Sequence, residues 1–258
     1  MAYMPSEKAT AIVLRTIDFS ETSLVVTLFT REFGKLGALA KGARRLKNPF
    51  ESALDVLCLC RIVFLHKSSE ALDLVTEAKL LRRFRLAGRS LAGLYGAYYV
   101  AELLGELTDQ NDPHPGLFDL ADETLAALAA GDAVARRLVR FELGALAHVG
   151  HMPSLECCAE CGAVVPVQGR IPFGALHGGV LCSACRAGKP QVAWLDAGVL
   201  RTMTQLADPQ GQAWRRMEIT PRTMGQLRGA LNHYLVNLLG HKPRMHQYLR
   251  ELYTVRRA

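Results

Sequence analysis

Two Cys-x-x-Cys motifs set the strongest constraint on how this chain can fold. Cys158 and Cys161 form the first motif, Cys182 and Cys185 form the second, and twenty residues separate the two. Four thiols at this spacing are typical of a structural zinc site, in which they surround one ion tetrahedrally. Such a shell is closed to water and substrate. We therefore expect one Zn²⁺ per chain that stabilises the fold and takes no part in chemistry.

Other cysteines and a histidine offer alternatives to this ligand set. Cys157 adjoins Cys158, but its spacing to Cys161 is one residue longer than the usual knuckle, so we assign the ligand to Cys158. His177 lies between the motifs, yet four cysteines already complete the shell, and we interpret it as a loop histidine. Cys58 and Cys60 lie in a strand-like segment and are expected to be buried thiols, because free cysteine is among the most buried residue types.

Length and composition bound the remaining possibilities. A chain of 258 residues with 50% hydrophobic residues can form one large domain or two to three small ones with real cores. No apolar run reaches the roughly 18–20 residues that span a bilayer, and the first residues lack the features of a signal peptide. We expect a cytoplasmic protein that does not enter membranes, in which four cysteines bind metal and three remain free thiols.

Charge is distributed unevenly along the chain. Residues 1–89 carry a net charge of +6, residues 90–160 of −8 and residues 161–258 of +9. This pattern indicates two basic regions for a polyanion and an acidic middle with another role, such as docking a protein. The alternative is that the segments neutralise one another in the folded protein.

Residues 1–80 have the pattern of a small β-barrel. Short β-rich runs recur with turn residues between them, and a glycine turn is expected at Gly34–Gly37. Five strands within about 80 residues favour a barrel of the OB type. The expected strands are Ala9–Arg15, Leu24–Phe29, Ala38–Lys41, Leu54–His66 and Ala71–Ala78.

Helical spacing replaces the strand pattern after the barrel. Three helices are expected between Leu91 and Gly150, and two more over Leu195–Ala207 and from Thr220–Pro221 to Gly240. We therefore predict an α+β multidomain protein. Its parts are an OB-fold at 1–80, a helical domain at 81–154, a Cys₄ zinc module at 155–190, and C-terminal helices at 191–258 that complete the helical domain.

Basic clusters in and near the barrel are candidates for DNA binding. Phosphates attract such clusters, and a basic loop on a barrel can follow a nucleic-acid backbone. The alternatives are a solvated charged loop and, for Phe84 within the second cluster, a core position. The candidates are Arg15, Lys35, Lys41, Arg44, Arg45 and Lys47 in the barrel region, and Arg82, Arg83 and Arg85 after it.

Motifs for catalysis are absent from the sequence. It contains no phosphate-binding GxxxxGK[ST], no GxGxxG after a strand, no HExxH and no GxSxG. The carboxylates of the helical region form no obvious metal pair. We therefore expect a protein that is not an enzyme.

The segment from Ile17 to Arg45 resembles the start of bacterial RecO proteins. It has a strand, an acidic turn, a second strand, a Gly-Lys-Leu turn and the basic run Lys41-Gly-Ala-Arg-Arg45. The resemblance continues through the helical segment, the cysteine insert and the helical tail. By this resemblance the basic barrel loop corresponds to Lys35, Lys41, Arg44 and Arg45, and the zinc ligands to the four cysteines.

The resemblance implies a recombination mediator. RecO proteins bind single- and double-stranded DNA, anneal complementary strands, and work with RecR to help RecA replace single-strand-binding protein. A nucleoid-associated location in the cytoplasm follows from such a role. Two other classes remain: a zinc-ribbon adaptor between proteins, whose DNA binding would not depend on the Lys41–Lys47 loop, and a metal-dependent nuclease, which would cleave DNA when a divalent ion is added.

Overall fold

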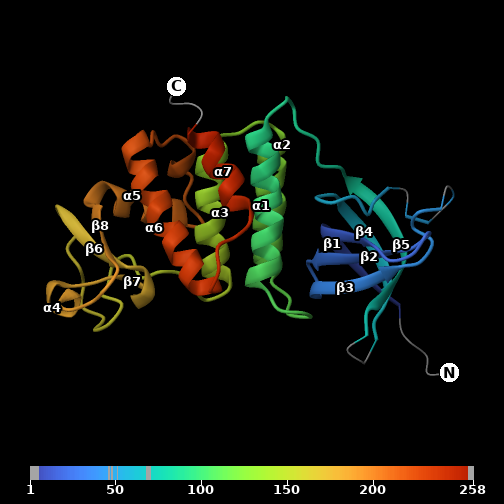
Figure 1. Ribbon diagram of the computed structural model, residues 1–258, viewed down its shortest axis with the longest axis horizontal. Helices are drawn as coiled ribbons and strands as arrows, with labels where there is room; N and C mark the ends of the chain where they lie inside the picture. Colours follow the sequence, from blue (N-terminus) through green and yellow to red (C-terminus); the bar gives the residue numbers. More distant parts are fainter. Residues whose placement is uncertain (1–5, 46, 48, 51, 68–70, 255–258) are drawn as a thin grey trace. The chain divides into compact units, whose positions relative to one another are not determined.

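The computed structural model describes residues 6–254 except 46, 48, 51 and 68–70. It divides into two compact units (Figure 1). The barrel unit comprises Met1–Arg137 and Arg244–Ala258, and the cysteine unit comprises Leu138–Pro243. The four-part domain division expected from the sequence stays a prediction.

Five strands of the barrel unit close into a barrel with the order β1-β2-β3-β5-β4. Neighbours pair antiparallel, except that β3 and β5 pair in parallel where Ala38–Ala40 meets Asp73–Val75. This five-stranded arrangement is that of an OB-fold and confirms the predicted fold class. The strands are β1 (Ser6–Asp18), β2 (Leu24–Thr30), β3 (Gly34–Ala40), β4 (Leu59–Leu65) and β5 (Asp73–Arg82).

Alternating side chains of these strands form the barrel core. In β3, Leu36, Ala38 and Ala40 point inward, as the two-residue period of a strand requires. The turn predicted at Gly34–Gly37 is wrong. This segment belongs to the strand, because it pairs with β2 through Thr30 to Thr27.

Described residues between β3 and β4 contribute to the barrel core. Phe50, Ala53 and Leu54 join the barrel core from this segment. The sequence predicted a strand from Leu54, which is wrong for its first part, since β4 begins at Leu59. Leu57, with a φ of 69°, stands in the left-handed region and turns the chain before the strand starts.

Helices complete the barrel unit: α1 (Leu91–Leu107), α2 (Pro115–Ala129), the start of α3 (Val134–His148), and α7 (Met245–Thr254). The three helices predicted between Leu91 and Gly150 are confirmed. Ser90 caps α1 through its hydroxyl, which accepts a hydrogen bond from the Gly93 amide. The Glu102 carboxylate of α1 accepts hydrogen bonds from the amides of Arg244 and Met245 at 2.7 and 3.0 Å, so it holds the start of α7.

The cysteine unit combines helices with a three-stranded sheet of order β7-β6-β8. The predicted helix from Leu195 is wrong at its start. Leu195 pairs with Ile171 in the sheet, and the helix begins at Ala197. Thr220 and Gly240 cap α6 as predicted. The elements are β6 (Arg170–Gly174), β7 (Gly179–Val180), α4 (Ser183–Arg186), β8 (Val192–Asp196), α5 (Ala197–Ala207) and α6 (Pro221–Leu239).

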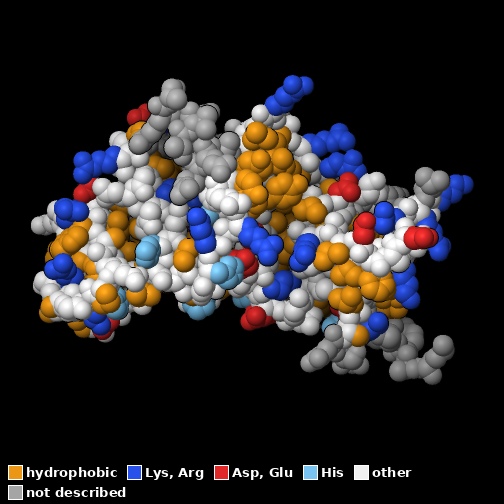
Figure 2. Space-filling view, viewed as in Figure 1, with side chains coloured by type: hydrophobic (Ala, Val, Ile, Leu, Met, Phe, Trp, Pro, Cys, Tyr) orange, Lys and Arg blue, Asp and Glu red, His pale blue; other side chains and the backbone are white. Residues whose placement is uncertain are grey.

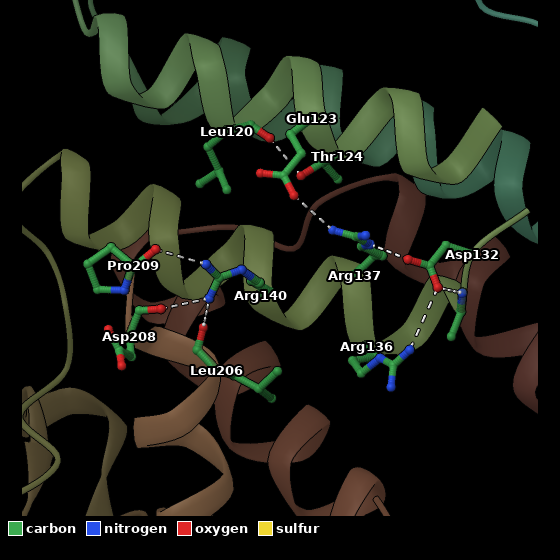
Figure 3. Close-up of polar contacts among 11 residues, drawn as sticks. Leu120, Glu123, Thr124, Asp132, Arg136, Arg137, Arg140, Leu206, Asp208 and Pro209 are labelled. Atoms are coloured by element: carbon green, nitrogen blue, oxygen red, sulfur yellow. Dashed lines mark hydrogen bonds and ion pairs between the residues drawn. The ribbon is translucent and has the colours of Figure 1, made fainter. Parts of the chain in front are cut away.

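Arginines of α3 bind backbone carbonyls and carboxylates within their own units (Figure 3). Within the cysteine unit, Arg140 donates to the carbonyl oxygens of Leu206, Asp208 and Pro209, which lie at the end of α5 and just after it. The last carbonyls of a helix have no partner inside it, so the guanidinium acts as its C-terminal cap. Within the barrel unit, Arg137 binds Asp132 at 2.5 Å.

No helix among the described residues is both long and apolar enough to cross a membrane.

Candidate nucleic-acid interface and metal centre

The four predicted cysteine ligands converge in the cysteine unit. The sulfur atoms of Cys158, Cys161, Cys182 and Cys185 all lie within 4.8 Å of one another. The sulfurs of Cys161 and Cys182 are 3.8 Å apart. Zn–S bonds of about 2.3 Å in a tetrahedron place sulfurs roughly 3.8 Å apart, so the spacing fits a zinc ion.

Local backbone structure aims both pairs of thiols at the centre of the cluster. Gly162, with a φ of 72°, lets the chain fold back so that its amide reaches the Cys158 carbonyl at 2.8 Å. Cys182 occupies the N-cap of α4, where its sulfur accepts a hydrogen bond from the Cys185 amide at 3.4 Å. Each knuckle therefore presents its two sulfurs on one side.

Electrostatics of the cluster favour a cation. Backbone amides, first that of Cys161 and then that of Cys182, lower the pKa of the Cys158 thiol to about 6. The neighbouring sulfur of Cys182 contributes most to raising the pKa of Cys185. Four sulfurs this close repel one another as thiolates. The cluster thus has the donors and the charge that a structural zinc ion needs.

The two alternative ligands lie outside this cluster. Cys157 forms a backbone bridge with Val164 and is not among the four converging thiols. The Nδ1 atom of His177 lies 3.4 Å from the Glu160 carboxylate. Among the described residues, these four cysteines are the group of His, Cys, Asp and Glu side chains that could hold a metal.

The basic Lys41–Lys47 segment lies against the loop that joins β1 and β2. The Arg44 amide donates to the Thr22 carbonyl at 3.0 Å, and its guanidinium donates to the Ser20 carbonyl at 3.3 Å. Asp18, at the end of β1, lies 3.0 Å from the same guanidinium. Lys41, Arg44, Arg45 and Lys47 are all exposed. The Lys41–Lys47 segment thus carries four exposed cations beside the β1–β2 loop, and one of them, Arg44, is paired with Asp18.

A row of paired residues across β1, β2 and β3 includes one of the candidate cations. Arg15 is exposed on β1 opposite Thr27 of β2, and Thr27 pairs with Gly37 of β3. Phe19, which the sequence analysis did not single out, extends from the β1–β2 loop with 64% of its surface exposed. The sequence offered one signal for Phe19, since it is an aromatic residue within the polar run Asp18-Phe-Ser-Glu. Figure 2 shows Lys and Arg side chains beside exposed apolar side chains around the barrel.

Lys35 has a structural role that the sequence did not reveal. Its ammonium donates to the carbonyl oxygens of Gly105, at 2.7 Å, and Thr108, both at the end of α1. Burial lowers the pKa of this amine. The ammonium is hydrogen-bonded to the helix terminus, so Lys35 is already engaged within the barrel unit, and its place in the phosphate-contacting group stays a prediction.

The second basic cluster is partly engaged within the barrel unit. Arg82 forms an ion pair with Asp122 of α2, and Arg83 lies 3.6 Å from Asp55. Arg85 is exposed. Arg31 likewise binds Asp119 at 2.9 Å. Barrel cations therefore neutralise part of the acidic middle segment. This agrees with the alternative that the charged segments neutralise one another in the folded protein.

Comparison with known proteins places most of the chain in one family. Residues 4–84 match the family model described as Recombination protein O N terminal, and residues 88–247 match Recombination protein O C terminal. A protein of Rhodopirellula baltica named DNA repair protein RecO is 40% identical over 93% of this chain and 97% of its own length. Proteins of the same name from Anaeromyxobacter dehalogenans and Myxococcus xanthus are 36% and 33% identical, covering 96% and 90% of this chain and 98% and 92% of their own lengths. The chain therefore belongs to the RecO family of DNA repair proteins.

Proposed function

We propose that this protein is a recombination mediator that binds single- and double-stranded DNA and anneals complementary strands. In this role it works with RecR to help load RecA onto DNA coated by single-strand-binding protein. Membership of the RecO family supports this role, and so does the barrel. A nucleoid-associated location follows from the same proposal.

The observation that carries the proposal is the attachment of the basic segment to the β1–β2 loop. OB-folds bind oligonucleotides over their second and third strands and the loops beside them. Here the Arg44 amide and guanidinium fasten the segment to Thr22 and Ser20 of that loop. In this proposal Lys41, Arg45 and Lys47, which are exposed in the same segment, bind the phosphates of an oligonucleotide that lies over the neighbouring strands.

The proposed contact combines charge with stacking. Exposed cations displace counterions from the phosphates, which gives affinity that does not depend on sequence and falls as salt rises. Phe19 offers an aromatic face to an unpaired base. Duplex bases are already stacked, so Phe19 serves single strands, whereas Arg15 and the loop cations serve both forms of DNA.

Annealing in this proposal needs no chemical step. Holding one strand by its phosphates leaves its bases available, and the screened charge lets a complementary strand approach. The zinc ion would hold the cysteine unit together and would not take part in pairing. No catalytic residue is assigned.

Equilibrium DNA binding over a salt series tests the proposal. A labelled single strand and a labelled duplex are titrated with wild type and with the double variant Arg44→Glu, Arg45→Glu. We expect the variant to bind both more weakly, and the slope of log K against log salt to fall by about 0.7 for each single-strand phosphate that is no longer neutralised. Arg201→Glu, Arg216→Glu is the matched control, because both arginines are exposed in the cysteine unit. Equal losses in both double variants would refute a specific role for the loop and favour the zinc-ribbon adaptor.

A further inference from the structure

Trp194 of the cysteine unit is an exposed tryptophan flanked by arginines. It lies in β8 opposite Pro172 of β6, and 38% of its surface is exposed. The guanidinium carbon of Arg186 lies 4.8 Å from the centre of its ring, and that of Arg170 lies 5.9 Å away. Both distances are typical of cation–π contacts. The other tryptophan of the chain, Trp214, is 1% exposed.

Charges around this ring leave a positive surplus. Asp196, two residues after Trp194, binds Arg222 at 3.1 Å, and Glu160 binds Lys189 at 2.7 Å, so each of these two carboxylates has its own cation. Arg170 is close enough to Asp196 to help Gln226 and Arg222 lower its pKa. In the part of the chain that the structure describes, however, neither Arg170 nor Arg186 forms an ion pair. Two guanidinium groups therefore remain available for an anion beside an aromatic face.

The metal centre fixes part of this patch. Arg186 follows Cys185 directly in α4, which begins at the Cys182 cap. Closure of the Cys₄ shell would therefore fix the backbone from which Arg186 reaches the indole. The β6–β8 pairing sets Arg170 and Trp194 on one sheet. Figure 2 shows Lys and Arg side chains beside apolar ones at the end of the cysteine unit that carries β6, β8 and α4.

We propose that Trp194, Arg170 and Arg186 form a second contact for single-stranded nucleic acid, separate from the barrel loops. An unpaired base stacks on the exposed indole, and the guanidinium groups bind the flanking phosphates. The inference rests on the proposed function and extends it, since each unit then has its own site for a strand. Tryptophan and arginine also mark protein interfaces. The surplus of positive charge beside the ring favours a polyanion that carries aromatic bases.

The unequal exposure of the two tryptophans makes the contact directly measurable. Stacking of a base quenches tryptophan fluorescence, and Trp214 is too buried to be reached. The full-length, zinc-loaded protein is titrated with oligo(dT) while fluorescence is recorded, and binding is followed in parallel by the anisotropy of a labelled strand. We expect quenching at the concentrations at which anisotropy rises. Trp194→Phe should abolish the quenching, and Trp194→Ala should in addition weaken binding roughly tenfold, the effect of about one lost base stack.

Charge variants separate this contact from the barrel. Arg170→Gln, Arg186→Gln should reduce both quenching and affinity, whereas Arg201→Gln, Arg216→Gln, which removes the same charge, should retain both. Normal anisotropy without quenching, or quenching that survives in Trp194→Phe, would overturn the second contact and leave the proposed function standing. Absence of any binding by wild type would overturn both. Quenching by an acidic peptide but not by oligo(dT) would assign the patch to a protein partner and also overturn the inference.

Discussion

The carboxylate of Glu142 in α3 is fully buried and accepts a 2.5 Å hydrogen bond from the guanidinium of Arg228 in α6. Arg228 also donates to Asn232 one turn later in the same helix. A charge removed from water this completely depends on its partner, because the loss of either member leaves the other buried and uncompensated. This ion pair therefore links α3 and α6 within the cysteine unit.

Arg228→Met should destabilise the protein by about 3–5 kcal/mol, the range observed when one partner of a buried ion pair is removed. Chemical denaturation with the tryptophan signal of Trp214 measures the change. Arg222→Met is the control, since Arg222 is 81% exposed in its ion pair with Asp196 and its loss should have little effect. Equal stability of the two variants would contradict the role assigned to Glu142 and Arg228.

Cys161→Ser should lower both zinc content and thermal stability, because binding of a structural ion is coupled to folding of its module. Metal analysis together with a melting curve measures both effects. Cys157→Ser provides a neighbouring control and should keep one zinc per chain, since Cys157 lies outside the four converging thiols. Loss of zinc from the Cys157 variant, or full retention in the Cys161 variant, would show that the ligand set is wrong.

Lys35→Met should lower the free energy of unfolding, because the carbonyl oxygens of Gly105 and Thr108 lose their donor. DNA affinity of the folded variant should stay within about twofold of wild type, whereas removal of a phosphate-binding cation would also reduce the salt slope. Stability and binding are measured on the same preparation. If Lys35→Met reduces the salt dependence of DNA binding and leaves the free energy of unfolding unchanged, Lys35 contacts DNA and does not stabilise the helix end.

Phe19→Ala should weaken binding to single strands roughly tenfold, in line with the loss of one base stack, while leaving duplex affinity nearly unchanged. The comparison uses labelled oligo(dT) and a duplex of equal length. Ile17→Ala is a suitable control, because this neighbouring residue is also exposed but has no aromatic ring. An equal loss on both DNA forms would indicate that Phe19 shapes the loop and does not stack on bases.

The Arg31–Asp119 ion pair should raise the free energy of unfolding, and this contribution should be lost in acid. The hydrogen bond from Arg31 lowers the pKa of Asp119 below its usual value of 3.8. The folded state thus binds this proton less readily than the unfolded state. The stabilisation by this ion pair is complete above the pKa of Asp119 in the unfolded state. It disappears as the pH falls through the pKa of Asp119 in the folded state. Both side chains are exposed, so the effect is small and should vanish at high salt. Denaturation of wild type and Asp119→Asn between about pH 5 and pH 2 tests the sign, and a gap that widens as pH falls would contradict it.

Short-range features of the sequence predicted the metal cluster and much of the fold. The Cys-x-x-Cys spacing acts within single turns, and the capping signals at Thr220–Pro221 and Gly240 act within one helix, so neighbouring residues decide both. The count of five β-rich runs also sufficed for the barrel, although the first half of β3 was predicted as a turn.

Features that depend on distant partners were missed. Lys35 meets its carbonyl acceptors about seventy residues along the chain, and nothing in the local sequence shows that its amine binds a helix terminus. Leu195 lies in a strand because Ile171 pairs with it, although its own pattern continues into a helix. The exposure of Phe19 and Trp194 likewise follows from tertiary packing, which composition alone does not reveal.

The most direct test of the central claim is the rate at which the protein anneals two complementary oligonucleotides without nucleotide. Wild type is compared with Arg44→Glu, Arg45→Glu and with the control Arg201→Glu, Arg216→Glu, and zinc content is checked in all three. We expect annealing by wild type and the control, and its loss in the loop variant with zinc retained. Equal annealing by wild type and the loop variant would contradict the assignment of the DNA contact to the barrel loops, and no annealing by wild type would contradict the mediator function itself.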